Sequence, residues 1–207
     1  MRTITKDANG VDCLAQQPRN LPWAQFLGAP CHIETGYSLR AEQHQLCCYC
    51  EQRAGAYSSH IEHMVPRSVE PNRTYDYTNM ASSCNGGTAA NQHCGHLKGQ
   101  DYDATRFASP HASVTVQLFC YLLDGTIEPA PDLDANGRAS AEYMIGLLGL
   151  NSPGPRGRRY THAAQLVATL GSTPSADVLT WAWAYYLQAD DGGVMQEYPS
   201  VSKGLLP

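Results

Sequence analysis

The spacing of hydrophobic positions changes along the second half of the chain from a period of two to one near 3.6. Residues 113–128 carry Val114, Val116 and Leu118 at alternate positions and then reach the turn signal Asp124-Gly125. Alternation that ends at such a turn is typical of a β-hairpin. We therefore expect a hairpin over these residues.

The following segments predict helices. Over residues 139–150 and 160–170, apolar side chains recur every three or four positions, as on one face of a helix. A further helix is expected from residue 174 to residue 188. Thr173-Pro174 has the form of a cap followed by proline at the first helical position.

The two ends of the chain carry weaker patterns. The first 36 residues are rich in Pro, Gly and Gln, and they predict irregular structure apart from a helical turn around residues 22–27. Ser38 is a suitable cap for a helix that runs to Leu46, just before the first cysteine pair. The tail after Asp190 is expected to be loosely ordered.

Composition limits the classes of protein to which this chain can belong. Its 207 residues, 43% of them hydrophobic, suffice for one domain or two small ones with a buried core. The net charge of −5 excludes binding of nucleic acid by overall positive charge. No apolar run approaches the roughly 20 residues of a membrane span, and the first residues lack the apolar stretch of a signal peptide. We expect a soluble, cytoplasmic protein that does not bind membranes.

Eight cysteines favour metal binding over disulfides, because thiols in the cytosol stay reduced. Five of them lie between residues 47 and 94. The other three, Cys13, Cys31 and Cys120, are expected to be isolated, small apolar residues in the core.

The cysteine spacing predicts a structural zinc site. Cys47 and Cys50 form a C-x2-C pair, and Cys84 with Cys94 supplies a second pair. Two such pairs complete a tetrahedron of thiolates that leaves no open position, so the Zn²⁺ is expected to be structural rather than catalytic. Cys48 is expected to be packed rather than to bind the ion.

Between the two pairs lies His60-Ile-Glu62-His63. In an extended segment His60 and Glu62 point to one face and His63 to the other. A carboxylate is a suitable ligand for Mg²⁺, and a neutral imidazole can take a proton from water. The segment is therefore a candidate for phosphodiester hydrolysis.

Several motifs together resemble the HNH endonucleases of the ββα-metal class. The nearest likeness is to the HNH proteins encoded beside some retrons and to the HNH component of the Septu anti-phage system. It covers roughly residues 1–160 and is densest over residues 47–99. Its motifs are Cys47-x2-Cys50-Glu51, His60-Ile-Glu62-His63-Met-Val-Pro66-Arg-Ser68, Tyr77-Thr-Asn79-Met, Cys84 and Cys94-Gly-His96-Leu-Lys98-Gly99.

The resemblance implies an α+β fold: a zinc-stapled ββα-metal HNH core with additional helices and a β-hairpin. Residues 1–46 would form an N-terminal extension, residues 47–110 the nuclease core, and residues 111–207 a hairpin and helical region packed on that core as one domain.

The resemblance also implies roles for individual residues. His63 matches the general base, and Glu62 matches the acidic residue that helps to hold a catalytic Mg²⁺ or Mn²⁺. Asn79 matches the middle Asn, which orients the base or joins the metal site.

The third position of the motif is less regular. Many members of the class carry His or Asn directly after the last zinc cysteine, where this chain has Gly95. We assign the third role, and a place among the metal ligands, to His96; His93 and His60 are the competing candidates. Lys98 would either contact a phosphate or be solvated.

The expected function is metal-dependent cleavage of DNA by an effector of anti-phage defence. The chain has no G-x4-G-K-[S/T] motif and is therefore not expected to hydrolyse ATP by that route. Septu-like systems pair the HNH protein with a separate ATPase, so the resemblance implies such a partner. Two alternatives remain: a non-catalytic zinc-stapled module that binds nucleic acid or a partner, and a nuclease that acts on RNA.

Two further segments are candidates for contacts with DNA or a partner. Arg156-Gly-Arg158-Arg159 would bind DNA, cap neighbouring helices or dock on an acidic face of a partner. The helix with Trp181 and Trp183 reads as a core or interface helix, and as a docking surface if the partner supplies the DNA affinity.

Overall fold

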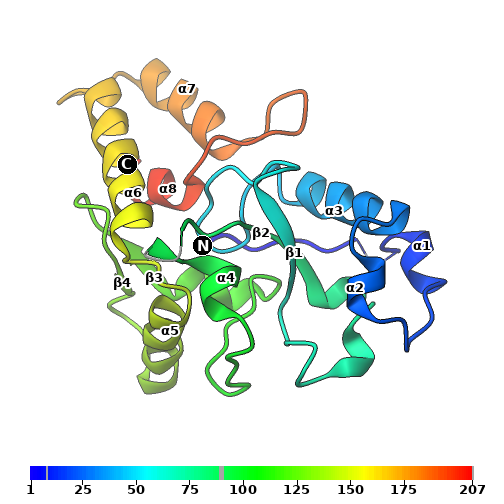
Figure 1. Cartoon of the computed structure of the whole chain (residues 1–207). Coiled ribbons are helices and arrows are strands. Elements are labelled where there is room, and N and C mark those ends of the chain that lie inside the picture. Colours follow the sequence, from blue (N-terminus) through cyan, green and yellow to red (C-terminus); the bar gives the residue numbers. More distant parts are fainter. Residues whose placement is uncertain (8, 89–90, 207) are drawn as a thin grey trace.

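The computed structural model describes residues 1–7, 9–88 and 91–206 of the chain. Helices surround two small antiparallel sheets, so the fold is α+β (Figure 1). Strands β1 and β2 and the short helix α4 lie between an N-terminal group of helices, α1 to α3, and a C-terminal group, α5 to α8. No helix among the described residues combines the length and the apolar character needed to cross a membrane.

The N-terminal helices are α1 (Asp12–Ala15), α2 (Trp23–Phe26) and α3 (Pro30–Glu42). The turn expected around residues 22–27 is present as α2. The start expected at Ser38 is wrong, because the helix begins eight residues earlier with Pro30 in its first turn. Proline suits that position because its missing N–H would have no helical partner there.

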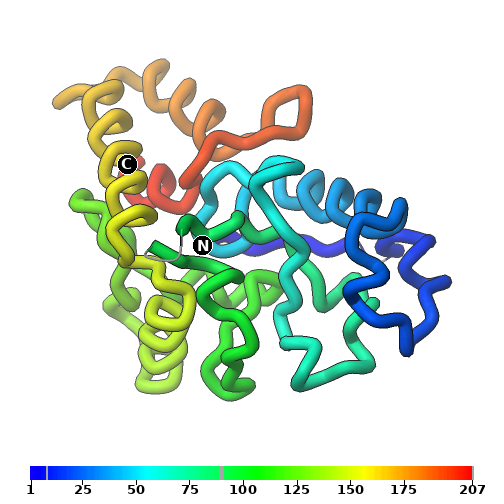
Figure 2. Tube along the Cα trace, viewed as in Figure 1, coloured from blue at the N-terminus to red at the C-terminus, as the bar shows by residue number. Residues whose placement is uncertain are grey.

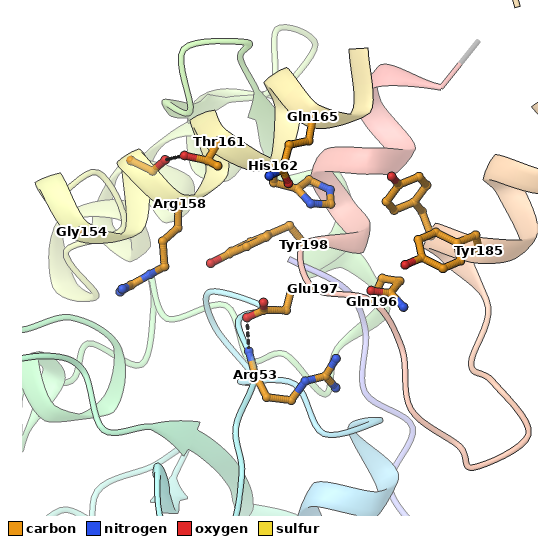
Figure 3. Close-up of a pocket in the computed structure, with 12 residues that line it drawn as sticks. Arg53, Gly154, Arg158, Thr161, His162, Gln165, Tyr185, Gln196, Glu197 and Tyr198 are labelled. Carbon is orange, nitrogen blue, oxygen red and sulfur yellow. Dashed lines mark hydrogen bonds between the residues drawn. The ribbon is translucent and has the colours of Figure 1, made fainter. Parts of the chain in front are cut away.

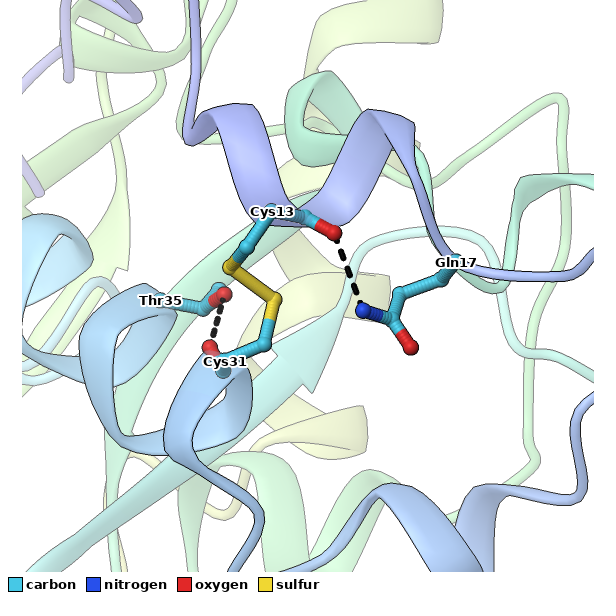
Figure 4. The surroundings of a disulfide bond; sticks show 4 residues. All are labelled: Cys13, Gln17, Cys31 and Thr35. Carbon is cyan, nitrogen blue, oxygen red and sulfur yellow. Dashed lines mark hydrogen bonds between the residues drawn. A yellow bond between two sulfur atoms is a disulfide. The ribbon is translucent and has the colours of Figure 1, made fainter.

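A disulfide joins α1 to α3 through Cys13 and Cys31 (Figure 4). The expectation that these two cysteines are isolated is therefore wrong. Side chains near the bond close the local turns: Gln17 Nε2 donates to the Cys13 carbonyl, and Thr35 Oγ1 donates to the Cys31 carbonyl. Cys120 is a free thiol and is half-buried.

The central element is an antiparallel pair, β1 (Ser59–His63) and β2 (Met80–Cys84), followed by α4 (Cys94–Lys98). The turns η1 (Pro71–Arg73) and η2 (Tyr77–Asn79) lie between the strands. Helix α3 packs against both strands, and α4 packs against β2. Residues 89 and 90, within the loop that joins the second cysteine pair, lie outside the described residues.

The two faces of this sheet belong to different parts of the core. Ile61 and Met80 pack with Val11, Leu14, Phe26 and Leu39 of the N-terminal helices. On the other face, Met64 and Ala81 belong to a cluster that contains the cysteines, Met1 and apolar residues of the hairpin and α5. The N-terminal segment runs from the middle of the molecule toward α1 (Figure 2), and Met1 is only 1% exposed.

The expected β-hairpin is present but shorter than the alternation suggests. It consists of β3 (Phe119–Tyr121) and β4 (Ile127–Pro129), which pair as antiparallel strands. The alternating segment before it forms the 3-10 helix η4 (Ser113–Gln117), in which Val114 and Val116 are exposed. Within the described parts of the chain no strand pairs with residues 113–117, so their alternation does not produce a sheet.

The C-terminal helices are α5 (Ala135–Leu147), α6 (Pro153–Leu170), α7 (Ala176–Leu187) and α8 (Pro199–Leu205). Each of the three expected helices is present, and α5 and α6 begin several residues earlier than the apolar pattern. The cap of α7 is Ser175, whose Oγ accepts from the Val178 N–H, rather than Thr173.

The expectation of a loosely ordered tail is wrong. Helix α8 packs against α6 and α7, and Val201 is only 1% exposed. The N–H and hydroxyl of Ser200 both donate to the buried Glu51 carboxylate beside the first cysteine pair. The tail is therefore fixed by a contact with a residue 149 positions away.

Candidate functional site

Four cysteines from three segments meet in the interior. Cys47 and Cys50 lie in a turn, Cys84 ends β2, and Cys94 begins α4. Their sulfur atoms all lie within 4.8 Å of one another, and all four residues are buried. The sulfurs of a zinc tetrathiolate with bonds of about 2.3 Å lie about 3.8 Å apart, and Cys50 Sγ lies 3.7 Å from Cys84 Sγ. The four residues expected from the spacing can therefore hold a structural metal such as zinc.

The backbone around the cluster fixes where the thiols point. The Cys84 N–H donates to Cys47 Sγ over 3.3 Å, and Glu51 closes the first turn with a positive φ of 63°. Cys94 also has a positive φ, 57°, and its N–H donates to the Leu148 carbonyl. These contacts tie both pairs of cysteines to neighbouring elements.

Two residues next to these ligands are not part of the tetrahedron. Cys48 is buried in the core, as expected from its position. His93 is buried beside Cys84, and its Nδ1 donates to the Asn91 carbonyl. It contacts the cysteine cluster rather than lining the cleft described next.

A cleft of about 330 Å³ lies alongside β1 and the start of α4. It is lined by four of the residues singled out in the sequence: His60, Glu62, His63 and His96. The same cleft contains Gly95, so it lies directly beside the cysteine cluster. The structure thus brings the histidines and the carboxylate of the motif together, on the frame that the cysteines form.

His63 is held as a neutral imidazole. Its Nε2–H donates to the Thr74 carbonyl over 2.9 Å, which leaves Nδ1 without a hydrogen and able to accept a proton. Burial lowers the pKa of His63 to about 4. Its ring packs edge-on against Trp23, with 4.9 Å between ring centroids. At neutral pH the side chain is therefore in the form that a general base requires.

Glu62 is a buried carboxylate with a buried counter-charge. Lys98 Nζ donates to Glu62 Oε1 over 2.8 Å, and Tyr49 Oη donates to the same oxygen over 3.1 Å. Burial alone would raise the pKa of Glu62, but the contacts with His60 and Lys98 lower it below its ordinary value. The carboxylate is thus ionised, and its second oxygen, Oε2, faces His60.

Lys98 was expected either to contact a phosphate or to be solvated, and its position in the structure contradicts both expectations. Its side chain is 1% exposed, so it is not solvated, and its ammonium group is used by Glu62 and by the His63 carbonyl. Lys98 therefore joins α4 to β1 rather than reaching a phosphate.

Asn79 lies outside the cleft. Its Oδ1 accepts from the Val65 N–H, and its Nδ2 donates to the Val65 carbonyl, over 2.9 and 3.0 Å. This pair of bonds uses the amide oxygen that a metal would need. Asn79 therefore holds the segment that follows His63, which is compatible with the expected alternative that it orients the base, while its amide oxygen is already used by Val65.

His60 and His96 stack on each other at the mouth of the cleft. Their ring centroids are 4.3 Å apart and their planes differ by 18°. His60 Nε2 lies 3.5 Å from Glu62 Oε2, as expected for residues on one face of a strand. Contact with Glu62 raises the pKa of His60 against the effect of burial, whereas burial and the neighbouring His60 lower the pKa of His96.

Sequence reasoning assigned no role to several residues of this cleft, among them Trp23, His32 and Arg67. Trp23 and His32 come from α2 and α3, and their separation from the motif by more than 25 positions gave no signal of proximity. Arg67 lies within the motif over residues 60–68, where no role was assigned to it, and its guanidinium lies 4.7 Å from the centre of the Trp23 ring. The cleft therefore has an aromatic wall with a cation packed on it.

The basic run on α6 does not form a single DNA-binding patch. Arg159 is 1% exposed, and its guanidinium donates to the carbonyls of Gly125 and Leu150. Arg156 pairs with Asp124, so two of the three arginines join α6 to the neighbouring hairpin and loop. These two arginines therefore contact the hairpin turn and the loop before α6, which differs from the expected binding to DNA, capping of helices or docking on a partner.

Arg158 lines a larger cavity of about 600 Å³ between α6, α7 and the segment before α8 (Figure 3). The acid there, Glu197, accepts from the Arg53 N–H, and His162 Nε2 bonds to Ser202 Oγ. Glu197 and His162 are thus bonded to Arg53 and Ser202 and are not paired with each other as an acid and a base. The cavity is therefore a weaker candidate for chemistry than the cleft beside the cysteines.

One protein similar to this chain carries the name of a nuclease. No protein-family model matches the chain. The chain is 30% identical over 138 residues to a protein of Vibrio cholerae serotype O1 biovar El Tor named "Retron Vc95 putative HNH endonuclease". The alignment covers 65% of this chain and 66% of that protein, slightly less than two thirds of its length.

Proposed function

We propose that the protein is a metal-dependent HNH endonuclease that hydrolyses phosphodiester bonds of DNA. The observation that carries the proposal is the state of His63, whose Nε2–H is bound to the Thr74 carbonyl while Nδ1 is left to accept a proton. This base shares a cleft with the ionised Glu62, beside a cysteine cluster suited to zinc. In this proposal residues 47–110 form the nuclease core, and residues 1–46 and 111–207 pack on it as parts of one domain.

The residues of the cleft fit a catalytic divalent cation such as Mg²⁺ or Mn²⁺. Glu62 Oε2 and His60 Nε2 are adjacent donors, and the buried His60 Nδ1 has no hydrogen-bond partner among the described residues. When bound, such a cation stabilises negative charge that develops on the phosphate and on the leaving oxygen.

The protein groups then have distinct tasks. His63 Nδ1 takes a proton from the attacking water, and the Thr74 carbonyl fixes the ring during this transfer. Lys98 and Tyr49 hold the Glu62 carboxylate in one orientation. Arg67, on the wall of the cleft, supplies a positive charge for the phosphate. By resemblance to the class, the products are a 5′-phosphate and a 3′-hydroxyl.

We propose the wider role from resemblance. The name of the V. cholerae relative refers to a retron, and the motifs are similar to those of the Septu HNH component. On this basis the chain acts as a nuclease effector in anti-phage defence, with a separate ATPase partner. The net charge of −5 is compatible with a separate partner: a negatively charged chain is repelled by phosphate, so the partner would supply much of the affinity for DNA.

The test is cleavage by purified, zinc-loaded protein in single-turnover reactions on supercoiled plasmid and on RNA, with Mg²⁺ or Mn²⁺. His63→Gln should reduce plasmid nicking at least about 100-fold, the lower end of the effect of a general base. Glutamine is preferred to alanine because His63 is buried against Trp23, so a truncation would also disturb packing.

His44→Gln is the control, since His44 lies outside the cleft and bonds to the Gly193 carbonyl. Zinc content should stay at one ion per chain in both variants. Nicking by His63→Gln at the wild-type rate would overturn the proposal. Cleavage of RNA alone would replace DNA as the substrate. Because the isolated chain is expected to bind DNA weakly, a wild type inactive on both substrates even at saturating protein concentration would favour the non-catalytic binding module.

A further inference from the structure

Gly95 occupies a position where no side chain fits. It follows Cys94 at the start of α4 and is buried in the wall of the cleft. A Cβ atom placed on it would lie 2.6 Å from His60 Nε2 and closer still to Glu62 Oε2. Real Cβ atoms do not approach neighbouring atoms so closely. The imidazole of His60 and the carboxylate of Glu62 therefore occupy the space into which a side chain at position 95 would extend.

His60 is directed into this space by the strand. Residues 60 and 62 lie on one face of β1, paired with Ser83 and Ala81 of β2. Their Nε2 and Oε2 atoms are 3.5 Å apart, close enough for one cation to bind both. His60 Nδ1 is buried and finds no hydrogen-bond partner in the described parts of the chain.

His96 has a different position. Its side chain is exposed, and it stacks on the face of the His60 ring. Across residues 1–7, 9–88 and 91–206, the four cysteines form the only group of three or more His, Cys, Asp or Glu side chains that could hold a metal ion. His96 therefore does not gather with His60 and Glu62 as a third donor, although its ring restricts the orientation of His60.

We propose that His60, together with Glu62, binds the catalytic cation, and that Gly95 is required because it leaves room for this imidazole. The proposal rests on the nuclease function proposed above, and it replaces His96 by His60 as the residue of the third role. Water supplies the remaining positions of the cation. Because imidazole binds Mn²⁺ and later transition metals better than it binds Mg²⁺, the site should prefer Mn²⁺.

The experiment measures Mn²⁺ binding to zinc-loaded protein by electron paramagnetic resonance, alongside plasmid nicking and zinc content. His60→Ala should weaken Mn²⁺ binding at least about tenfold, because loss of a residue that only supports a metal ligand already costs about that much affinity. The zinc should stay in place. His96→Ala is the matched control, because it removes the stacking partner and keeps both proposed donors; its Mn²⁺ affinity should fall less.

Gly95→Asn supplies the decisive comparison. In the wild-type background it should lower the melting temperature, because the new side chain meets His60 and Glu62. In the His60→Ala background the same change should lower the melting temperature less, because of the two side chains that meet position 95 only Glu62 then remains.

The outcomes separate this inference from the function on which it rests. If His63→Gln abolishes nicking while His60→Ala binds Mn²⁺ as the wild type does, the nuclease stands and the role of His60 is wrong. A larger loss of Mn²⁺ binding in His96→Ala than in His60→Ala returns the third role to His96. A wild type that neither binds Mn²⁺ nor cleaves nucleic acid overturns both proposals.

Discussion

Lys98 Nζ lies 2.8 Å from Glu62 Oε1, and the side chains of both residues are more than nine-tenths buried. The same ammonium group donates to the His63 carbonyl over 2.9 Å. One lysine at the end of α4 therefore fixes the two neighbouring residues of β1 that are proposed to do the chemistry. It also keeps the carboxylate ionised in the interior, where an unpaired charge would be costly.

Lys98→Met should destabilise the protein by about 3 kcal/mol, because removing one partner of a buried ion pair leaves an uncompensated charge. The measurement is the free energy of unfolding in urea at pH 7. The double variant Glu62→Gln/Lys98→Met should lose less stability than Lys98→Met alone, because no buried charge remains. Lys203→Met, at an exposed lysine of α8, is the control and should change stability little. Equal effects of Lys98→Met and Lys203→Met would contradict the importance of the pair.

Removal of one cysteine of the cluster should remove the zinc. Cys84→Ser is expected to lose the metal and to give insoluble or protease-sensitive protein, since structural zinc is worth about 10–16 kcal/mol in small peptides. The measurement is elemental analysis of purified protein together with limited proteolysis. Cys48→Ala is a matched control, because this buried thiol lies between two ligands and is not one of them. Zinc-free protein that folds as well as the wild type would contradict the prediction.

The cysteine cluster and the shared face of His60 and Glu62 could be predicted from sequence because both follow from local spacing. A C-x2-C pair suits one tight turn, and the alternation of a strand fixes which neighbours share a face. The same reasoning failed for Lys98, because a single lysine in a sequence is most often solvated. Its burial depends on Glu62, 36 residues earlier, which the two strands and α4 bring to it.

Other failures also come from distant contacts. The order of the tail depends on Ser200 bonding to Glu51, and the pairing of Cys13 with Cys31 depends on how α1 packs on α3. In contrast, the start of α3 could have been predicted from the sequence, because Pro30 is a local signal for the first turn of a helix and should have been preferred to Ser38.

Reduction of the Cys13–Cys31 bond should destabilise the N-terminal helices. The bond joins residues 18 positions apart, and closing a loop of that size is worth about 3 kcal/mol in the chain-entropy view. The variant Cys13→Ser should therefore lower the melting temperature relative to oxidised wild type, with zinc content unchanged. Cys120→Ser, at a free and half-buried thiol, is the control. If thiol reagents titrate Cys13 and Cys31 in the native protein, the bond is absent and this prediction fails.

The last prediction concerns acid and rests on His111. Its Nδ1 donates to the Thr78 carbonyl over 3.1 Å, and its Nε2 is buried. Burial, with Lys6 and then Arg73 nearby, lowers the pKa of His111 to about 4, although the Thr78 carbonyl and Glu42 act in the opposite direction. The ring is therefore neutral in the folded protein at pH 7.

Because the folded-state pKa lies below the ordinary value of 6.5, the unfolded chain takes up a proton at a pH where the folded chain does not. The contribution of His111 to stability is complete above pH 6.5 and is lost as the pH falls toward 4. Between pH 7 and pH 5 the loss should be on the order of 1 kcal/mol, since the half-buried ring is partly screened by solvent. His63 and the cysteines add losses in the same range of pH, so the test is a difference between proteins.

His111→Gln should show a smaller fall in the free energy of unfolding between pH 7 and pH 5 than the wild type, measured in urea at both values. At pH 7 the variant is expected to be slightly less stable, because the bond to Thr78 is altered; at pH 5 the two proteins should approach each other. Parallel losses in the two proteins would show that His111 takes up its proton at the same pH in the folded and unfolded chains.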